Sequence, residues 1–241
     1  MMLSQCFLVL FWLFSHVETV TVSTDQHTGA EIGKHVILKC TFDQIDNNPT
    51  VMWEKVGVKQ TVHQYKGNVD DFSEQHGNYT KRTEIDGSTI KKGDASLTLK
   101  NVNIWDEGIY KCSVSNDHGF GEAFMNLSVW AKSTVGIRIL WKSNGSDVLS
   151  CQSSGWYPAP DVTWSDTFGN NLYKDCETKM IRDSSGLFHV SHDLKQMHNS
   201  QSQYVCSIQH EWMAEPERTR VAFTDGATMI RMDDGKGSPD L

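Results

Sequence analysis

The sequence predicts an all-β protein of two sandwiches in tandem, because one pattern of cysteine, tryptophan and tyrosine occurs in it twice. The first copy consists of Cys40, Trp53 and Tyr110-Lys111-Cys112. The second copy keeps the same distance between its first two members, Cys151 and Trp164, and ends in Tyr204-Val205-Cys206. This order is typical of immunoglobulin sandwiches, in which a disulfide joins the two sheets and packs against the indole. We therefore expect two tandem immunoglobulin-like β-sandwiches with disulfides Cys40–Cys112 and Cys151–Cys206.

The cysteine spacing also separates the two sandwiches by type. Cys40 and Cys112 lie far enough apart for the extra strands of a variable-type domain, whereas Cys151 and Cys206 are closer, as in a constant-type domain. The 241 residues accommodate two domains of about 100 residues each. The expected divisions are a leader at 1–23, a variable-type domain at 24–130, a constant-type domain at 131–224 and a disordered tail at 225–241, where the chain turns polar and glycine-rich.

The strands of the first domain follow from alternation of apolar and polar residues. The expected strands are 36–42, 51–56 with Trp53 inward, 62–66 as an extra strand, 96–99, one opening after Asp106, and one opening at Gly119-Phe120-Gly121. In the last strand the inward set is Ala123, Met125, Leu127 and Val129, which leaves Phe124 and Asn126 outward. Arg82 is expected to pair with Asp106 and to stabilise the domain.

Residues 6–14 form an apolar run that fits the core of a secretory signal, although no Lys or Arg precedes Lys34. The alternative is a buried first strand. Cleavage is expected between Ser15 and Ser23. No later run approaches the about 18 apolar residues that span a membrane, so the chain as given is expected to be secreted. A longer form with such a run would be held on the external side of the plasma membrane.

An extracellular location agrees with the cysteines and with three glycosylation sequons. Each disulfide closes a loop long enough to stabilise its domain by about 4 to 5 kcal/mol on the chain-entropy model. Cys176 is the odd cysteine, and it is a buried thiol, an exposed reactive thiol or an interchain link. The sequons predict glycans on Asn78, Asn126 and Asn144.

The composition and the motifs argue against nucleic-acid binding, metal binding and catalysis. With 30 acidic and 22 basic residues and a net charge of -8, the chain would repel nucleic acid. His189 and His192 lie on an expected strand, where positions three apart face opposite ways, so they do not predict a metal site. No phosphate-binding loop or nucleophile motif is present. We expect no enzyme activity, no cofactor, no metal and no small-molecule substrate.

Two longer motifs carry a resemblance to a known family. They are Asp106-Glu107-Gly108-Ile109-Tyr110-Lys111-Cys112 in the first domain and Gly155-Trp156-Tyr157-Pro158-Ala159-Pro160-Asp161-Val162-Thr163-Trp164 in the second. Over about residues 30 to 224 the chain resembles the ectodomain of the B-seven and butyrophilin family of T-cell costimulatory ligands. The resemblance implies a protein receptor on T cells or other lymphocytes, and binding through the outer face of the sheet that carries the extra strands.

The candidate binding residues are those expected on that outer face and in the loop beside it. They are Met52, Glu54, Tyr65, Ile109, Lys111, Ser113, Asp117, His118 and Phe120. Apolar and aromatic groups beside a few charges suit a recognition surface. Two alternatives stay open: the apolar residues cover a sheet edge, or the same face serves a cell-adhesion protein, homophilic or heterophilic, with a homodimer as one form.

Overall fold

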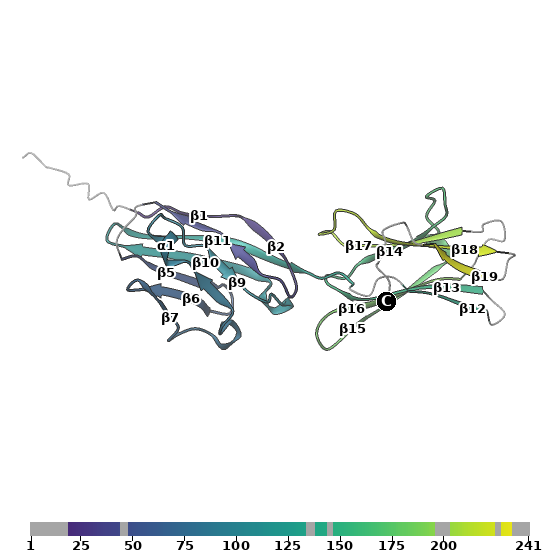
Figure 1. Ribbon diagram of the computed structural model, residues 1–241, viewed down its shortest axis with the longest axis horizontal. Helices are drawn as coiled ribbons and strands as arrows, with labels where there is room; N and C mark the ends of the chain where they lie inside the picture. Colours follow the sequence, from purple (N-terminus) through teal and green to yellow (C-terminus); the bar gives the residue numbers. More distant parts are fainter. Residues whose placement is uncertain are drawn as a thin grey trace, which may run out of the picture. The chain divides into compact units, whose positions relative to one another are not determined.

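The computed structural model describes residues 19–43, 48–133, 138–143, 147–195, 203–224 and 228–232. Strands dominate these residues, and the helical segments are single turns (Figure 1). These turns are η1 (Gly77–Tyr79), α1 (Gly87–Ile90), η2 (Ile104–Asp106) and η3 (Tyr173–Asp175). The all-β class is thereby confirmed. Most of the expected leader, the sequon residue Asn144 and residues 233–241 lie outside the described residues.

The larger sheet of the first sandwich has six strands in the order β2-β11-β10-β5-β6-β7. Their bounds are β2 His27–Glu31, β11 Gly119–Trp130, β10 Gly108–Asn116, β5 Thr50–Lys55, β6 Gln60–Lys66 and β7 Val69–Asp71. Strand β2 runs parallel to β11, whereas β5 pairs with β10 and with β6 in antiparallel fashion. The strand β6 is the extra strand expected at 62–66, and β7 adds a second one at the edge.

The other strands of the first sandwich form two small groups. A three-stranded sheet has the order β3-β9-β8, and β1 pairs with β4. The bounds are β1 Val22–Thr24, β3 Val36–Leu38, β4 Cys40–Phe42, β8 Thr83–Ile85 and β9 Leu97–Leu99. The strand expected at 36–42 is thus divided at Lys39, because its two halves pair with different partners.

The core of the first sandwich forms around the expected cysteine pair. A disulfide joins Cys40 on β4 to Cys112 on β10, and both residues are fully buried. Trp53 is also fully buried, and its Nε1 donates a hydrogen bond of 3.0 Å to the carbonyl oxygen of Ala95. Along β11 the inward set is as expected, with Met125, Leu127 and Val129 buried and Ala123 half-buried.

The expected Arg82–Asp106 pair remains a prediction. Nη1 of Arg82 donates to the carbonyl oxygen of Asn78 at 2.8 Å. Asp106 is buried, and its Oδ2 accepts from the backbone N–H of Asn103 at 2.8 Å as part of a capping box on η2. Such a box satisfies backbone groups at the start of a helical turn.

The second sandwich has two four-stranded antiparallel sheets, in the orders β12-β13-β16-β15 and β14-β17-β18-β19 (Figure 1). Their strands are β12 Arg138–Ser143, β13 Asp147–Trp156, β14 Asp161–Ser165, β15 Cys176–Arg182, β16 Phe188–Leu194, β17 Gln203–Gln209, β18 Glu217–Thr224 and β19 Thr228–Met232. A disulfide joins Cys151 on β13 to Cys206 on β17. Trp164 is buried beside it, and its Nε1 donates to the carbonyl oxygen of His192 at 2.9 Å.

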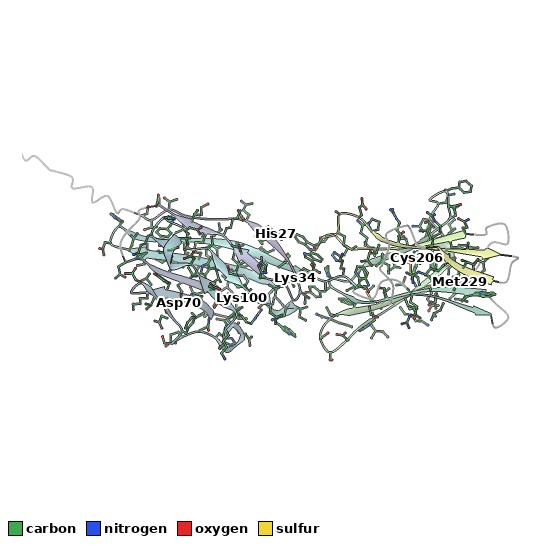
Figure 2. The ribbon with its side chains drawn as sticks, viewed as in Figure 1. His27, Lys34, Asp70, Lys100, Cys206 and Met229 are labelled. Carbon is green, nitrogen blue, oxygen red and sulfur yellow. A yellow bond between two sulfur atoms is a disulfide. The ribbon has the colours of Figure 1, made fainter. Side chains whose placement is uncertain are left out.

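The prediction of a disordered tail from residue 225 is wrong for residues 228–232. These residues form β19, which pairs with β18 in a register that sets Thr224 opposite Thr228 and Phe223 opposite Met229. Met229 packs against the core of the second sandwich, and Figure 2 labels it there with Cys206. The polar average of the tail concealed a short strand-forming segment that buries an apolar side chain.

Cys176 joins neither disulfide. It lies at the start of β15, where it is half-buried and packs against the core of the second sandwich. Its thiol donates to the carbonyl oxygen of Leu172 at 3.3 Å. Among the three interpretations of the odd cysteine, this position favours a buried thiol.

Candidate functional site

The phase of β10 and β5 is set by the disulfide and its tryptophan. In the pairing of these strands Cys112 lies opposite Trp53, Lys111 opposite Glu54 and Ser113 opposite Met52. Because successive side chains on a strand point to opposite faces, buried Cys112 and Trp53 place their sequence neighbours on the outer face of the sheet. Ile109 shares this phase with Lys111 and Ser113.

A cluster of charges lies on this outer face across three adjacent strands. Nζ of Lys111 on β10 is 2.7 Å from Oε2 of Glu54 on β5 and 3.7 Å from Oε2 of Glu122 on β11. The pKa of Lys111 is raised, chiefly by its hydrogen bond with Glu54. Ion pairs near the protein surface contribute little to stability, at most about 1 kcal/mol each. The main effect of the cluster is therefore to set the charge pattern of the face.

Three large apolar side chains are exposed on the same strands. Ile109 is 48% exposed, Phe120 54% and Phe124 50%. Phe120 and Phe124 share the exposed phase of β11 with Glu122. We call Ile109, Lys111, Phe120, Glu122, Phe124 and Glu54 the outer patch. Exposed aromatic groups beside charges are the composition of protein recognition surfaces.

Two of the candidate residues are not exposed as expected. Tyr65 is only 5% exposed and lies opposite inward Val51. The register of β5 and β6 shifts between Trp53 and Glu54, and Val62 and His63 are buried in succession. Tyr65 lies on the regular side of this shift: Trp53 pairs with His63 and Val51 pairs with Tyr65, so Tyr65 shares the inward phase of Val51 and Trp53.

Ser113 is the second correction. It has the outward phase, but it is only 8% exposed, and its hydroxyl has no hydrogen-bond partner among the described residues. The exposure of the remaining candidates is closer to what the sequence predicts. Met52 and His118 are half-buried and Asp117 is exposed. The backbone N–H of His118 donates to Oδ1 of Asn116 at 2.9 Å, which orders the loop between β10 and β11.

Glu122 and Phe124 were missed as site residues, although the sequence held a signal for both. The alternation of Met125, Leu127 and Val129 had placed Phe124 outward, and Glu122 has the same parity. Neither residue was among the candidates, whose last member on β11 is Phe120. The ion pair between Glu122 and Lys111 could not be predicted from one strand, because the two residues lie on neighbouring strands.

The histidine pair does not form a site. His189 Nε2 contacts Oδ2 of Asp183 at 2.8 Å, whereas His192 is buried with Nδ1 at 2.7 Å from Oγ1 of Thr178. Burial lowers the pKa of His192 and so favours its neutral form. Within the described ranges no group of three or more His, Cys, Asp or Glu side chains is placed to hold a metal ion.

Of the sequons, Asn78 is exposed in η1. Asn126 is half-buried, and its Nδ2 lies 3.3 Å from Nδ1 of His27. None of the helices described is long and apolar enough to cross a membrane.

Comparisons with known proteins cover both sandwiches. Residues 23–130 match the immunoglobulin V-set domain family, and residues 132–218 match the family described as butyrophilin subfamily 3 member A2-like, Ig-C domain. V-set domain-containing T-cell activation inhibitor 1 of Rattus norvegicus is 35% identical over 62% of this chain and 52% of its own length. Selection and upkeep of intraepithelial T-cells protein 8 of Mus musculus is 29% identical over 90% of this chain and 56% of its own length.

The chain thus spans about half the length of these curated relatives. A third relative, butyrophilin subfamily 2 member A2 of Homo sapiens, is 30% identical over 67% of this chain and 31% of its own length. Among solved structures, bovine butyrophilin superposes with a TM-score of 0.76 at 22% identity, covering 86% of this chain and 98% of that one, which supports the shared fold. From its paired V-set and C2-set domains and these relatives, the chain belongs to the B-seven and butyrophilin family of immunoglobulin proteins.

Proposed function

We propose that the chain is an extracellular immune ligand that binds a protein receptor on T cells or other lymphocytes through the outer patch and so modulates T-cell activation. The observation that carries the proposal is the outer patch itself, with three exposed large apolar side chains around a charge cluster that joins three strands. The names of two relatives, a T-cell activation inhibitor and a protein of selection and upkeep of intraepithelial T cells, support the immune setting.

The energetic argument rests on the aromatic residues. A half-exposed phenylalanine loses its remaining contact with water when a partner covers it, and aromatic anchors of this kind dominate many interfaces. Charges around them contribute more to orientation and association rate than to affinity. The outer patch has both kinds of side chain, aromatic and charged, on one sheet.

The test is binding of the glycosylated ectodomain, as a fluorescent tetramer, to activated T cells. The double variant Phe120→Ala/Phe124→Ala should bind at least about tenfold more weakly, since each anchor contributes about 1 to 2 kcal/mol. The matched control is Phe168→Ala in the second sandwich, where the ring is 88% exposed and lies off the patch. Equal binding of the double variant and the control variant would contradict the proposal.

Adhesion between copies is the alternative function. Two copies meeting through this face would bring together two clusters, each with two carboxylates and one ammonium group, which opposes association. We therefore expect a monomer in sedimentation velocity at micromolar concentration. A stable dimer that the double variant abolishes would favour adhesion instead.

A further inference from the structure

We infer that the receptor inserts a basic side chain, arginine or lysine, between Phe120 and Phe124 and against the carboxylate of Glu122. The inference deepens the proposed function and rests on it, because it names the chemistry of the partner at the same surface.

The charge balance of the outer patch favours a basic partner. Lys111 is shared by two carboxylates, and the contacts are unequal, at 2.7 Å to Glu54 and 3.7 Å to Glu122. A separation of 3.7 Å exceeds the usual length of a hydrogen bond between nitrogen and oxygen. Glu122 is also the more exposed of the two carboxylates. Glu122 therefore retains the capacity to accept hydrogen bonds from a partner, and the cluster keeps a net negative charge.

The aromatic neighbours of Glu122 also favour a basic partner. Phe120 and Phe124 lie two positions before and after it on β11, so the three side chains stand in a row on one face of the sheet. A cation above an aromatic ring within about 6 Å is attracted to the ring, and a guanidinium group can stack on such a ring while it binds a carboxylate. A basic side chain at this row would be attracted both by the aromatic rings and by the carboxylate, whereas an acidic side chain would be repelled.

The experiment compares Glu122→Gln with Glu74→Gln in the binding of ectodomain tetramers to activated T cells at several NaCl concentrations. Glutamine keeps the shape of Glu122 and removes its charge, and Glu74 is an exposed carboxylate of the first sandwich outside the outer patch. Glu122→Gln should weaken binding about tenfold or more and make it less dependent on salt. Glu74→Gln should match the unmodified chain, and both variants should keep its melting temperature.

The outcomes separate the two proposals. Binding of the unmodified chain together with an unchanged affinity and salt dependence of Glu122→Gln would overturn the inference and leave the proposed function standing. Failure of the unmodified, folded ectodomain to bind any lymphocyte population would overturn the proposed function itself.

Discussion

Gly121 shows how a single residue without a side chain fixes the start of β11. A Cβ atom placed there would fall well inside contact distance of the carbonyl oxygen of Val20 and 2.9 Å from Cγ2 of Val22. The backbone of residues 20–22 therefore approaches β11 more closely than any other residue type allows. We expect Gly121→Ala to destabilise the first sandwich by about 1 to 3 kcal/mol, because backbone must move to admit the methyl group.

Gly77 provides the control for this substitution. It lies in η1 of the same sandwich, and a Cβ atom there would have no neighbour within 4 Å. Gly77→Ala should change the free energy of unfolding by less than about 0.5 kcal/mol. Urea unfolding followed by tryptophan fluorescence measures both variants. Similar stabilities for the two would refute the close approach of residues 20–22 to β11.

For single residues, alternation predicted the exposed face correctly wherever a buried cysteine or tryptophan fixes the phase of the strand. Ile109, Lys111 and Glu54 were placed correctly because Cys112 and Trp53 fix the inward positions beside them. Tyr65 was misplaced because the expected strand 62–66 holds no cysteine or tryptophan that fixes its phase, and the inward phase of Tyr65 follows only from its pairing with Val51. The burial of Ser113 likewise depends on neighbouring strands.

At the scale of elements, the β15–β16 hairpin depends on Asp183. Its Oδ1 accepts from Ser185 Oγ at 2.6 Å, from the backbone N–H of Ser185 at 2.9 Å and from that of Leu187 at 3.0 Å. Its Oδ2 contacts His189 Nε2 at 2.8 Å. These hydrogen bonds, that of the Ser185 side chain first, hold the pKa of Asp183 well below its usual range.

The lowered pKa of Asp183 gives a pH-dependent prediction. A carboxyl group whose pKa is depressed in the folded state stabilises that state above its unfolded pKa of about 3.9, and this contribution is lost as pH falls toward the folded value. Asp183→Asn should therefore lower the melting temperature at pH 7, and the deficit should shrink below about pH 4. Asp161→Asn, at an exposed carboxylate of β14, is the control. A deficit for Asp183→Asn that stays constant from pH 7 to pH 3 would contradict the argument.

Strand β19 could not be predicted from the average composition of its segment. Residues 225–241 are polar on average, but Thr228-Met229-Ile230-Arg231-Met232 follows an Asp225-Gly226 dipeptide, which is a hairpin signal after the strand-like 217–224. The structure pairs these five residues with β18 and packs Met229 on the core. Local alternation and turn chemistry were the better evidence there.

For the whole molecule, the duplicated Cys, Trp and Tyr-x-Cys pattern was sufficient to predict the fold class and both disulfides. Each disulfide depends on a few residues, a cysteine pair with a tryptophan and a tyrosine beside it, that can be read directly from the sequence. The charge cluster of the outer patch was not predictable in the same way. Glu54, Lys111 and Glu122 come from three strands, and only their lateral pairing brings them together. The candidate site was therefore located by family resemblance and alternation, whereas its chemistry required the structure.

The last prediction concerns the N-terminus of the secreted protein, and it rests on our proposal that a leader is removed. Val20 is buried, and the backbone N–H of Thr21 donates to Oδ1 of Asp43 at 2.6 Å. Val22–Thr24 forms β1, which pairs with Cys40–Phe42 on β4. Cleavage after Val20 would remove the buried valine, and cleavage after Thr24 would remove the whole strand beside the disulfide.

Within the expected window from Ser15 to Ser23, the fold therefore favours cleavage before Val20. N-terminal sequencing of the chain recovered from the medium of expressing cells should give a first residue between His16 and Val20. As a control, a form designed to begin at Asp25 should be secreted poorly or melt at a lower temperature, because β4 would then lack its partner strand. A secreted chain that begins after Thr24 with unchanged stability would show that β1 does not contribute to the fold, and recovery of the uncleaved chain in the membrane fraction would refute the leader.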